Sequence, residues 1–157
     1  MITKQDLENA QKVWGQGVVH IGTLQSDRVQ CENYTQNFVD ELYDFKNKQV
    51  LFKPTKAAID QFRTTSKSAI SYFIGGNSKY TEDKGFALQP WTQVRFENAA
   101  LILEENRALA MGNYFFTDIN GQDTKVEYTF GYRKDTNGKL KIDVHHSSLP
   151  FNIEESV

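Results

Sequence analysis

The first part of the chain repeats apolar residues at the spacing of an α-helix. Over residues 7–24 they recur every three or four positions, which places them on one face of a helix. Thr3 and Asp6 precede this run and resemble a capping box, although Asp is shorter than the usual Glu or Gln. The pattern predicts an amphipathic helix over about 4–25, and a similar pattern predicts a second helix over about 28–44.

The segment after these helices changes period twice. The run QVLF at residues 49–52 is short and β-prone, and Pro54 ends it. Helical spacing then returns over residues 56–76, where Gly75 and Gly76 are predicted to end the helix. We therefore expect one short strand between the second and third helical regions.

The second half of the chain has the composition of a β-sheet. Four segments rich in β-branched and aromatic residues are separated by EENR, NGQD and DTNGK, which are good turn sequences. The segments cover residues 92–103, 108–119, 124–134 and 139–148. Strands joined by short turns form an antiparallel meander, so we predict an α+β fold with N-terminal helices packed on a curved antiparallel sheet. Such a sheet encloses a conical cavity, as in the nuclear transport factor 2-like fold.

Length and composition narrow the class further. The chain has 157 residues, which predicts a single domain over 1–157. Its net charge is −2 and it has no basic stripe, so it is not expected to bind nucleic acid. No apolar run approaches the roughly 18 residues of a membrane span, and the polar N-terminus does not resemble a secretory signal. With Cys31 as the only cysteine, these features predict a cytoplasmic protein without an internal disulfide.

The last predicted strand carries the densest candidate chemistry. KIDVHHSSLPF, residues 141–151, holds two of the three histidines of the chain. Side chains alternate along a strand, and the apolar residues before the histidines occupy the even positions. Continuing the count places His146 and Ser148 on the inner face, and His145 and Ser147 on the outer face. A β-bulge would exchange the two pairs, and bulges are common beside active sites.

This motif is a poor metal site. Adjacent histidines on a regular strand point to opposite faces, whereas tetrahedral zinc needs three or four ligands. The only other histidine, His20, lies on the first predicted helix, and no motif links it to the pair. We therefore predict that the protein works without a metal and without another cofactor.

The inner face of the sheet is instead expected to hold a pocket. An inward imidazole or hydroxyl must pair with a neighbour, with water or with a ligand, because leaving it unpaired costs roughly 1–3 kcal/mol. Aromatic residues alternate on the neighbouring strands and suit the walls of such a pocket. They are Tyr128, Phe130 and Tyr132 on one strand, and either Tyr114 with Phe116 or Phe115 with Asn113 on another.

Several motifs together resemble one enzyme family. TFGYRKDTNGKLKIDVHHSSLPF, preceded by MGNYFFT and by LFKPTKA…SAISYFIGG, is similar to the iota class of carbonic anhydrases. The likeness runs from about Trp14 to Phe151, and HHSSLPF is its most specific element. The class is related to the association domain of calcium/calmodulin-dependent protein kinase II. The resemblance implies a nuclear transport factor 2-like homodimer that interconverts carbon dioxide and bicarbonate. Cyanobacterial and algal members work without a metal, whereas some diatom and bacterial relatives are described as manganese- or zinc-dependent.

The resemblance also implies a set of site residues. The anion pocket of the family uses a threonine after the first short strand, a tyrosine late in the third helical region, and a serine with a histidine in the terminal motif. By motif position and strand parity, the catalytic residues of this chain would be Thr55, Tyr72, Ser148 and His146. Ser147 and His145 are assigned to substrate binding, because an error of one residue in the parity would bring them inward.

Each of these residues has an expected role. Tyr72 and Ser148 are expected to polarise the substrate, and Thr55 is expected to position the attacking water. His146, whose ordinary pKa is near 6.5, is expected to accept the proton or to orient Ser148. Arg63 is expected to be a solvated helix arginine rather than a group that attracts the anion.

Other functions of the same fold stay open at this point. A ketosteroid-isomerase-like enzyme would need a carboxylate base inside the cone, and the nearest candidate, Asp143, is predicted to face outward. The chain also suits an oligomerisation module like the kinase association domain, or a sensor that binds a small anion without turning it over. Carbon dioxide hydration activity would separate the enzyme from these alternatives.

Overall fold

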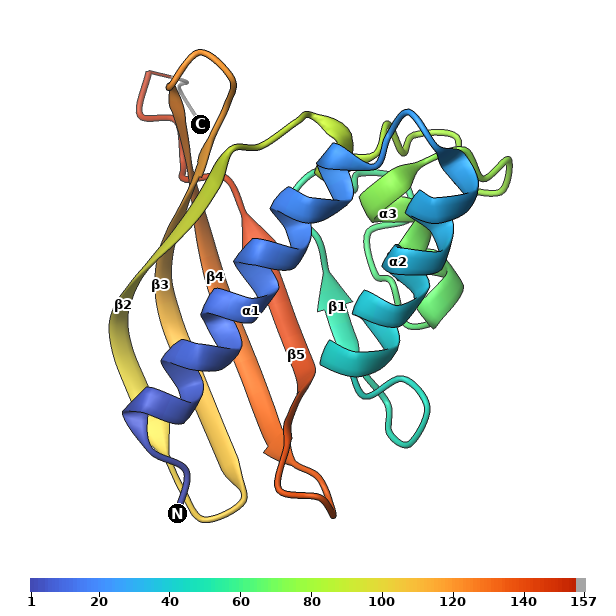
Figure 1. The fold of residues 1–157 in the computed structure, drawn as a ribbon. Helices are drawn as coiled ribbons and strands as arrows, with labels where there is room; N and C mark the ends of the chain where they lie inside the picture. The colour runs from blue at the N-terminus through green and yellow to red at the C-terminus, as the bar shows by residue number, and fades with distance from the viewer. Residues whose placement is uncertain (155–157) are drawn as a thin grey trace.

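The structure, a computed structural model, describes residues 1–154 and places all helices on one side of a single sheet (Figure 1). The predicted domain over 1–157 therefore extends three residues beyond the described part. In chain order the elements are α1 (Lys4–Thr23), α2 (Arg28–Leu42), β1 (Leu51–Lys53), α3 (Ser66–Ile74), the short 3₁₀ helix η1 (Phe86–Leu88), β2 (Gln93–Leu103), β3 (Arg107–Thr117), β4 (Asp123–Lys134) and β5 (Leu140–Ser148).

The first two helices form where the sequence predicts them. The Thr3 hydroxyl accepts the Asp6 N–H at 3.1 Å and the Asp6 carboxylate accepts the Thr3 N–H at 2.8 Å, so the capping box is confirmed. Asp27 caps α2 through the N–H of Gln30. None of the helices described within residues 1–154 is long and apolar enough to cross a membrane.

The third helical region is shorter than predicted. Helix α3 begins only after Thr65, which forms a second capping box with Ser68, and residues 56–65 are a loop. The loop is not helical because other partners take its amides: Glu82 accepts the N–H groups of residues 58–60, and the Phe52 carbonyl accepts that of residue 63. The predicted C-terminal boundary is confirmed, since both glycines after α3 have positive φ angles.

The sheet has the strand order β1-β5-β4-β3-β2. Strands β2 to β5 form the predicted antiparallel meander. Strand β1 adds a parallel edge to β5, with Phe52 paired to His145, so the sheet is mixed rather than purely antiparallel. This parallel pairing brings the loop that follows β1 beside the end of the terminal motif.

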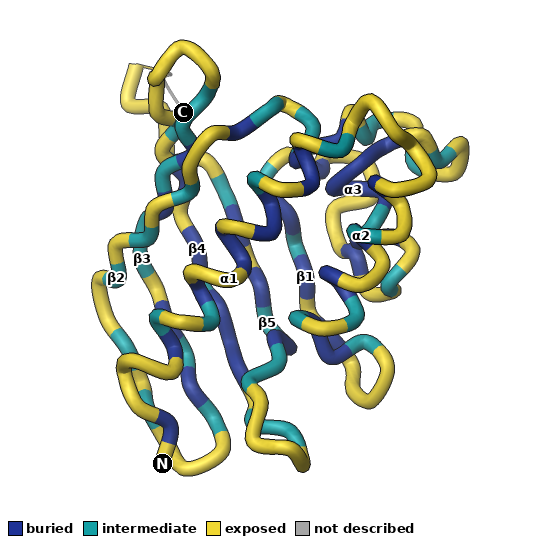
Figure 2. The backbone as a smooth tube through the Cα atoms, viewed as in Figure 1, coloured by how far each residue is buried: buried dark blue, intermediate teal, exposed yellow. Residues whose placement is uncertain are grey.

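The core is aromatic and is centred on Trp14 of α1. On β3 the inward residues are Tyr114 and Phe116, not Phe115 and Asn113. Together with the inward residues of β4, each is at most 2% exposed: Tyr114, Phe116, Tyr128, Phe130 and Tyr132. Six aromatic rings and the His145 imidazole have centroids within 6.4 Å of the Trp14 ring. Figure 2 shows the buried segments along β4, β5 and β1 and on the helix faces turned toward them. The side of the sheet that the helices cover is therefore largely filled by side chains.

Candidate active site

A β-bulge in β5 decides which side chains of the terminal motif face the helices. The pairing of β4 with β5 passes from Tyr132 opposite Ile142 directly to Gly131 opposite Val144. Asp143 is therefore an extra residue without a partner of its own, and Asp143 and Val144 together oppose one glycine. The inward and outward alternation beyond Asp143 is reversed relative to a regular strand.

The reversal turns His145 and Ser147 inward. They are only 2% and 1% exposed, whereas His146 is exposed and Ser148 is half-buried. The Ser148 hydroxyl donates to the exposed side chain of Glu127. The prediction that His146 and Ser148 face the interior is therefore wrong. The bulge exchanges the two pairs, so that His145 and Ser147 face inward.

An ion pair and a glycine hold the bulge. Arg107 donates to both carboxylate oxygens of Asp143, at 2.7 and 2.5 Å, and Arg133 approaches the same carboxylate at 3.4 Å. A Cβ on Gly131 would lie 2.9 Å from the Val144 Cβ, so glycine leaves room for the two side chains opposite it. Asp143 thus faces away from the inward hydroxyls, as predicted, and is paired with two arginines. It is not available as the catalytic base that a ketosteroid-isomerase-like enzyme would need.

Inside the sheet, the Ser147 hydroxyl joins two other hydroxyls. Its Oγ lies 2.7 Å from Thr55 Oγ1 and 2.5 Å from the Tyr114 hydroxyl, while the Glu127 carbonyl is more distant at 3.3 Å. The Tyr114 hydroxyl also lies 3.1 Å from His145 Nε2. The parallel pairing of β1 with β5 is what brings Thr55 to this point.

His145 is held between two aromatic rings and two tyrosine hydroxyls. Its ring stacks on Phe130 and Phe52, with centroids 3.9 and 4.8 Å apart. Its Nδ1 lies 2.8 Å from the Tyr43 hydroxyl, which accepts the Trp14 indole N–H at 2.9 Å. Burial lowers the pKa of His145 well below its ordinary value, and the neighbouring His146 contributes in the same direction. The imidazole is therefore neutral at physiological pH.

One assignment of the hydrogens gives the buried groups of this chain a consistent set of donors and acceptors. Indole N–H groups only donate, so the Tyr43 oxygen accepts from Trp14 and its own hydrogen is free to bond His145 Nδ1. A neutral imidazole that accepts at Nδ1 carries its hydrogen on Nε2 and donates it to Tyr114. Tyr114 then donates to Ser147, whose hydrogen points to the nearer acceptor, Thr55. The chain ends in a Thr55 hydrogen that is available to a ligand.

Tyr72 provides a second available hydrogen at the same place. Its hydroxyl accepts the Lys56 N–H at 3.2 Å and lies beside the Thr55 side chain. Burial raises the pKa of Tyr72, although the hydrogen bond from the Lys56 N–H opposes that rise. The hydroxyl is therefore protonated at neutral pH, and its hydrogen has no acceptor among the described residues.

A pocket of about 240 Å³ opens beside Tyr72. Its walls include Lys56, Tyr72, Glu82, Asp83, Lys84 and Phe86. The Tyr72 ring stacks on Phe86, with centroids 5.5 Å apart, so one side of the pocket is aromatic. Tyr72 thus stands between this pocket and the hydroxyls of Thr55 and Ser147.

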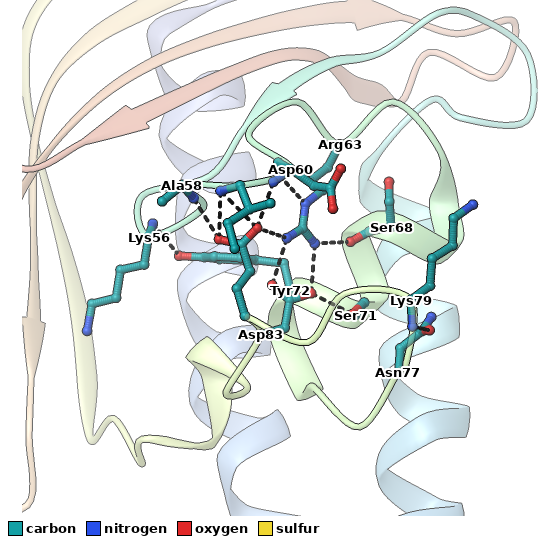
Figure 3. A network of polar contacts seen from close by, with 12 residues as sticks. Lys56, Ala58, Asp60, Arg63, Ser68, Ser71, Tyr72, Asn77, Lys79 and Asp83 are labelled. Carbon is teal, nitrogen blue, oxygen red and sulfur yellow. Dashed lines mark hydrogen bonds and ion pairs between the residues drawn. The ribbon is translucent and has the colours of Figure 1, made fainter.

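The loop that carries Thr55 is fixed by a buried arginine (Figure 3). Arg63 is fully buried, so the expected solvated helix arginine is wrong. Its guanidinium binds Asp83 through two hydrogen bonds of 2.7 and 2.8 Å, and donates to the carbonyls of Asp60 and Ser68. The Ser71 hydroxyl also donates to Asp83, at 2.5 Å. These contacts join the loop to α3, which positions Thr55 relative to Tyr72.

The ligand chemistry of the described part of the chain does not suggest a metal centre. Within residues 1–154, no three His, Cys, Asp or Glu side chains are grouped so that they could hold a metal ion. His20 is exposed on α1, where its ring packs against Tyr34 with centroids 4.4 Å apart. The donors that converge near Thr55 are neutral hydroxyls, which suit an oxyanion better than a cation.

Sequence reasoning missed three members of the site. The sequence pattern places Tyr43 near the end of the second predicted helix and Tyr114 on the wall of the predicted pocket, and neither position indicates a hydrogen-bonding role. Trp14 was one of the periodic residues of the first helix. The available signal is that buried Tyr and Trp side chains usually find a hydrogen-bond partner.

Comparison with known proteins gives one consistent family. The sequence profile of the metal-independent carbonic anhydrase family matches residues 5–149. A metal-independent carbonic anhydrase of Nostoc sp. (strain PCC 7120 / SAG 25.82 / UTEX 2576) is 40% identical over 153 residues, which are 96% of this chain and 75% of that protein. The crystal structure of a cyanobacterial iota-carbonic anhydrase complexed with bicarbonate is 40% identical, with a TM-score of 0.92 over 96% of this chain and 94% of that one.

A more distant neighbour shares the fold. It is a Xanthomonas campestris protein described as a calcium/calmodulin-dependent protein kinase II association domain, with 18% identity and a TM-score of 0.67. The match covers 98% of this chain and 91% of that one. Together with a dehydratase-like member of the nuclear transport factor 2-like family (TM-score 0.57), it confirms the predicted fold class.

The buried His145 predicts a pH-dependent stability. Its ordinary value of 6.5 applies to the unfolded chain, and its pKa in the folded chain is lower, so below pH 6.5 the unfolded state binds a proton that the folded state does not. The free energy of unfolding should therefore fall by up to about 1.4 kcal/mol per pH unit as the pH drops below 6.5. Urea denaturation at several pH values measures this slope.

Two variants identify the histidine responsible. His145→Gln should flatten the slope by this amount, whatever its effect on the stability at pH 7. His146→Gln, which alters an exposed imidazole, should keep the wild-type slope. An unchanged slope in His145→Gln would contradict the assignment of a buried neutral imidazole.

Proposed function

This chain belongs to the metal-independent carbonic anhydrase family, and we propose that Thr55, Tyr72, His145 and Ser147 form the site at which it interconverts carbon dioxide and bicarbonate. The observation that carries the proposal is the convergence of hydroxyl groups from three separate elements at the end of one directed hydrogen-bond chain. The known bicarbonate complex of a 40% identical structure supports this anion as the ligand. His145 and Ser147 take the inward positions that strand parity assigned to His146 and Ser148.

The reaction needs donors for a developing oxyanion. When water adds to carbon dioxide, a new bond forms between the water oxygen and the carbon, and one C=O electron pair moves onto oxygen. Hydrogens already aimed at that oxygen stabilise the charge without further reorganisation. Thr55 and Tyr72 supply such hydrogens, because the oxygens of both hydroxyls already accept hydrogen bonds from the protein.

The role of His145 is to orient other groups. Its depressed pKa makes it a weak proton acceptor, and both of its nitrogens are already engaged by tyrosine hydroxyls. In the tautomer described above it directs Tyr114 toward Ser147, and each successive donor polarises the next. The proton lost by the attacking water therefore leaves to a base in the solvent and is not stored on this imidazole.

Aromatic side chains supply the other requirement. Carbon dioxide is apolar, and Tyr72 and Phe86 offer it a stacked aromatic wall beside the hydroxyl donors. The arrangement replaces the strategy of zinc enzymes, in which the metal lowers the pKa of its bound water to about 7. Here the assistance is given by orientation of the water and by neutral donors to the oxyanion.

The direct test is a stopped-flow hydration assay on protein treated with a strong chelator. We expect carbon dioxide hydration to persist after treatment and to change less than twofold when zinc or manganese is added back. Activity that appears only with added metal would contradict the proposal. Bicarbonate binding without any turnover would instead identify a small-anion-binding module.

Neighbouring serines provide a matched pair of variants. Ser147→Ala removes the link between Tyr114 and Thr55 and should lower kcat by about 10²–10³, the usual effect of losing one aligned donor. Ser148→Ala removes the same hydroxyl from the outward neighbour and should leave kcat within twofold. Tyr72→Phe, which keeps the ring, should behave like Ser147→Ala. Equal activity of the two serine variants would refute the placement of the site.

We also propose that the protein acts as a cytoplasmic homodimer. The outer face of β2 and β3 supports the dimer, because Ile102 and Met111 are more than half exposed there. Sedimentation velocity should give about twice the 18.0 kDa mass of one chain, and Met111→Lys should shift the protein toward that single-chain mass. A single-chain mass for the wild type would contradict the dimer, and cell fractionation tests the location.

A further inference from the structure

The pocket beside Tyr72 has two cations without a carboxylate partner. Lys56 and Lys84 both line it, both are exposed, and neither forms an ion pair within residues 1–154. Figure 3 shows the Lys56 side chain extending away from the contacts of Arg63. The ammonium groups are therefore free to interact with a solute in the pocket.

The two carboxylates on the pocket wall are already engaged by the protein. Glu82 accepts the N–H groups of Ala58, Ile59 and Asp60 at 2.7–3.1 Å, and Arg63 lies 3.8 Å from it. Hydrogen bonds from these amides, that of Ala58 first, keep the pKa of Glu82 below its ordinary value. Asp83 is bound by both Arg63 nitrogens and by Ser71. Because both carboxylates are held by these contacts, Lys56 and Lys84 carry the charges on the pocket wall that have no partner among the described residues.

We propose that Lys56 and Lys84 make this pocket an anion vestibule, through which bicarbonate reaches and leaves the hydroxyl site behind Tyr72. The inference rests on the proposed function and adds the route of the charged substrate. Unpaired charges at the mouth of a pocket raise the local concentration of the opposite ion and its association rate. Lys56 is well placed for this, because its own backbone N–H binds the Tyr72 hydroxyl.

The vestibule distinguishes the two substrates by charge. Bicarbonate is an anion and is attracted by the two ammonium groups, whereas carbon dioxide is neutral and gains nothing from them. Removing the lysine charges should therefore weaken the binding of bicarbonate and leave that of carbon dioxide unchanged. Salt should have the same effect on the wild type, since the Debye length falls from about 30 Å at 0.01 M to about 10 Å at 0.1 M ionic strength.

The experiment compares Lys56→Gln/Lys84→Gln with a control of equal charge change. Lys12→Gln/Lys125→Gln removes two exposed lysines from α1 and β4, outside the pocket. In stopped-flow assays at 10 mM ionic strength, the vestibule variant should raise the KM for bicarbonate about tenfold in dehydration, at the lower end of known steering effects. Its KM for carbon dioxide in hydration should stay within twofold. The control should match the wild type in both directions.

Three results would overturn the vestibule. They are an unchanged KM for bicarbonate, an equal rise in the control variant, and a parallel rise in the KM for carbon dioxide. Bicarbonate binding measured directly by ¹³C NMR separates this inference from the proposed function. If the wild type bound bicarbonate without turnover, the proposed function would be contradicted. The vestibule would still be supported if Lys56→Gln/Lys84→Gln weakened that binding, and contradicted if it did not.

Discussion

The ion pair between Asp143 and Arg107 is the interaction on which the rest of the site depends. It secures an additional residue in β5, opposite a glycine that leaves space for it. With Ile142 inward, a regular strand of the same sequence would send His146 and Ser148 into the core and expose the other pair. The extra residue instead gives the core His145 and Ser147, so a polar contact on the outer face determines the chemistry on the inner one.

The polar groups on the inner face of the sheet are buried and therefore need hydrogen-bond partners. An imidazole and several hydroxyls lie among aromatic rings, where an unpaired polar group is costly. Pairing them in one continuous chain from Trp14 to Thr55 removes that cost, and in the proposed direction of the chain the Thr55 hydrogen is its free end. The hydrogen bonds that stabilise these buried groups therefore also orient them relative to one another. In the proposed site, neutral groups suffice because each donor is already oriented before the substrate arrives.

Much of the fold follows from local patterns. The capping box at Thr3, the helical spacing after it and the turns between the last four strands are local signals, and each corresponds to an element of the structure. The bulge is different, because it depends on Arg107 and Gly131 of other strands. Residues 56–65 fail to form a helix for the same kind of reason, since Glu82 takes their amides.

Thr55 and Tyr72 are predicted as site residues from family motifs, whereas the hydroxyls of Tyr43 and Tyr114 become evident only once the distant elements are packed together.

The loop around Glu82 has one more consequence. Three successive backbone N–H groups pointing to one place form a concavity that binds anions, and here a carboxylate of the same chain fills it. A tethered carboxylate competes at an effective concentration that dissolved bicarbonate does not match. With Glu82 in place, these three amides have no free position for a dissolved anion.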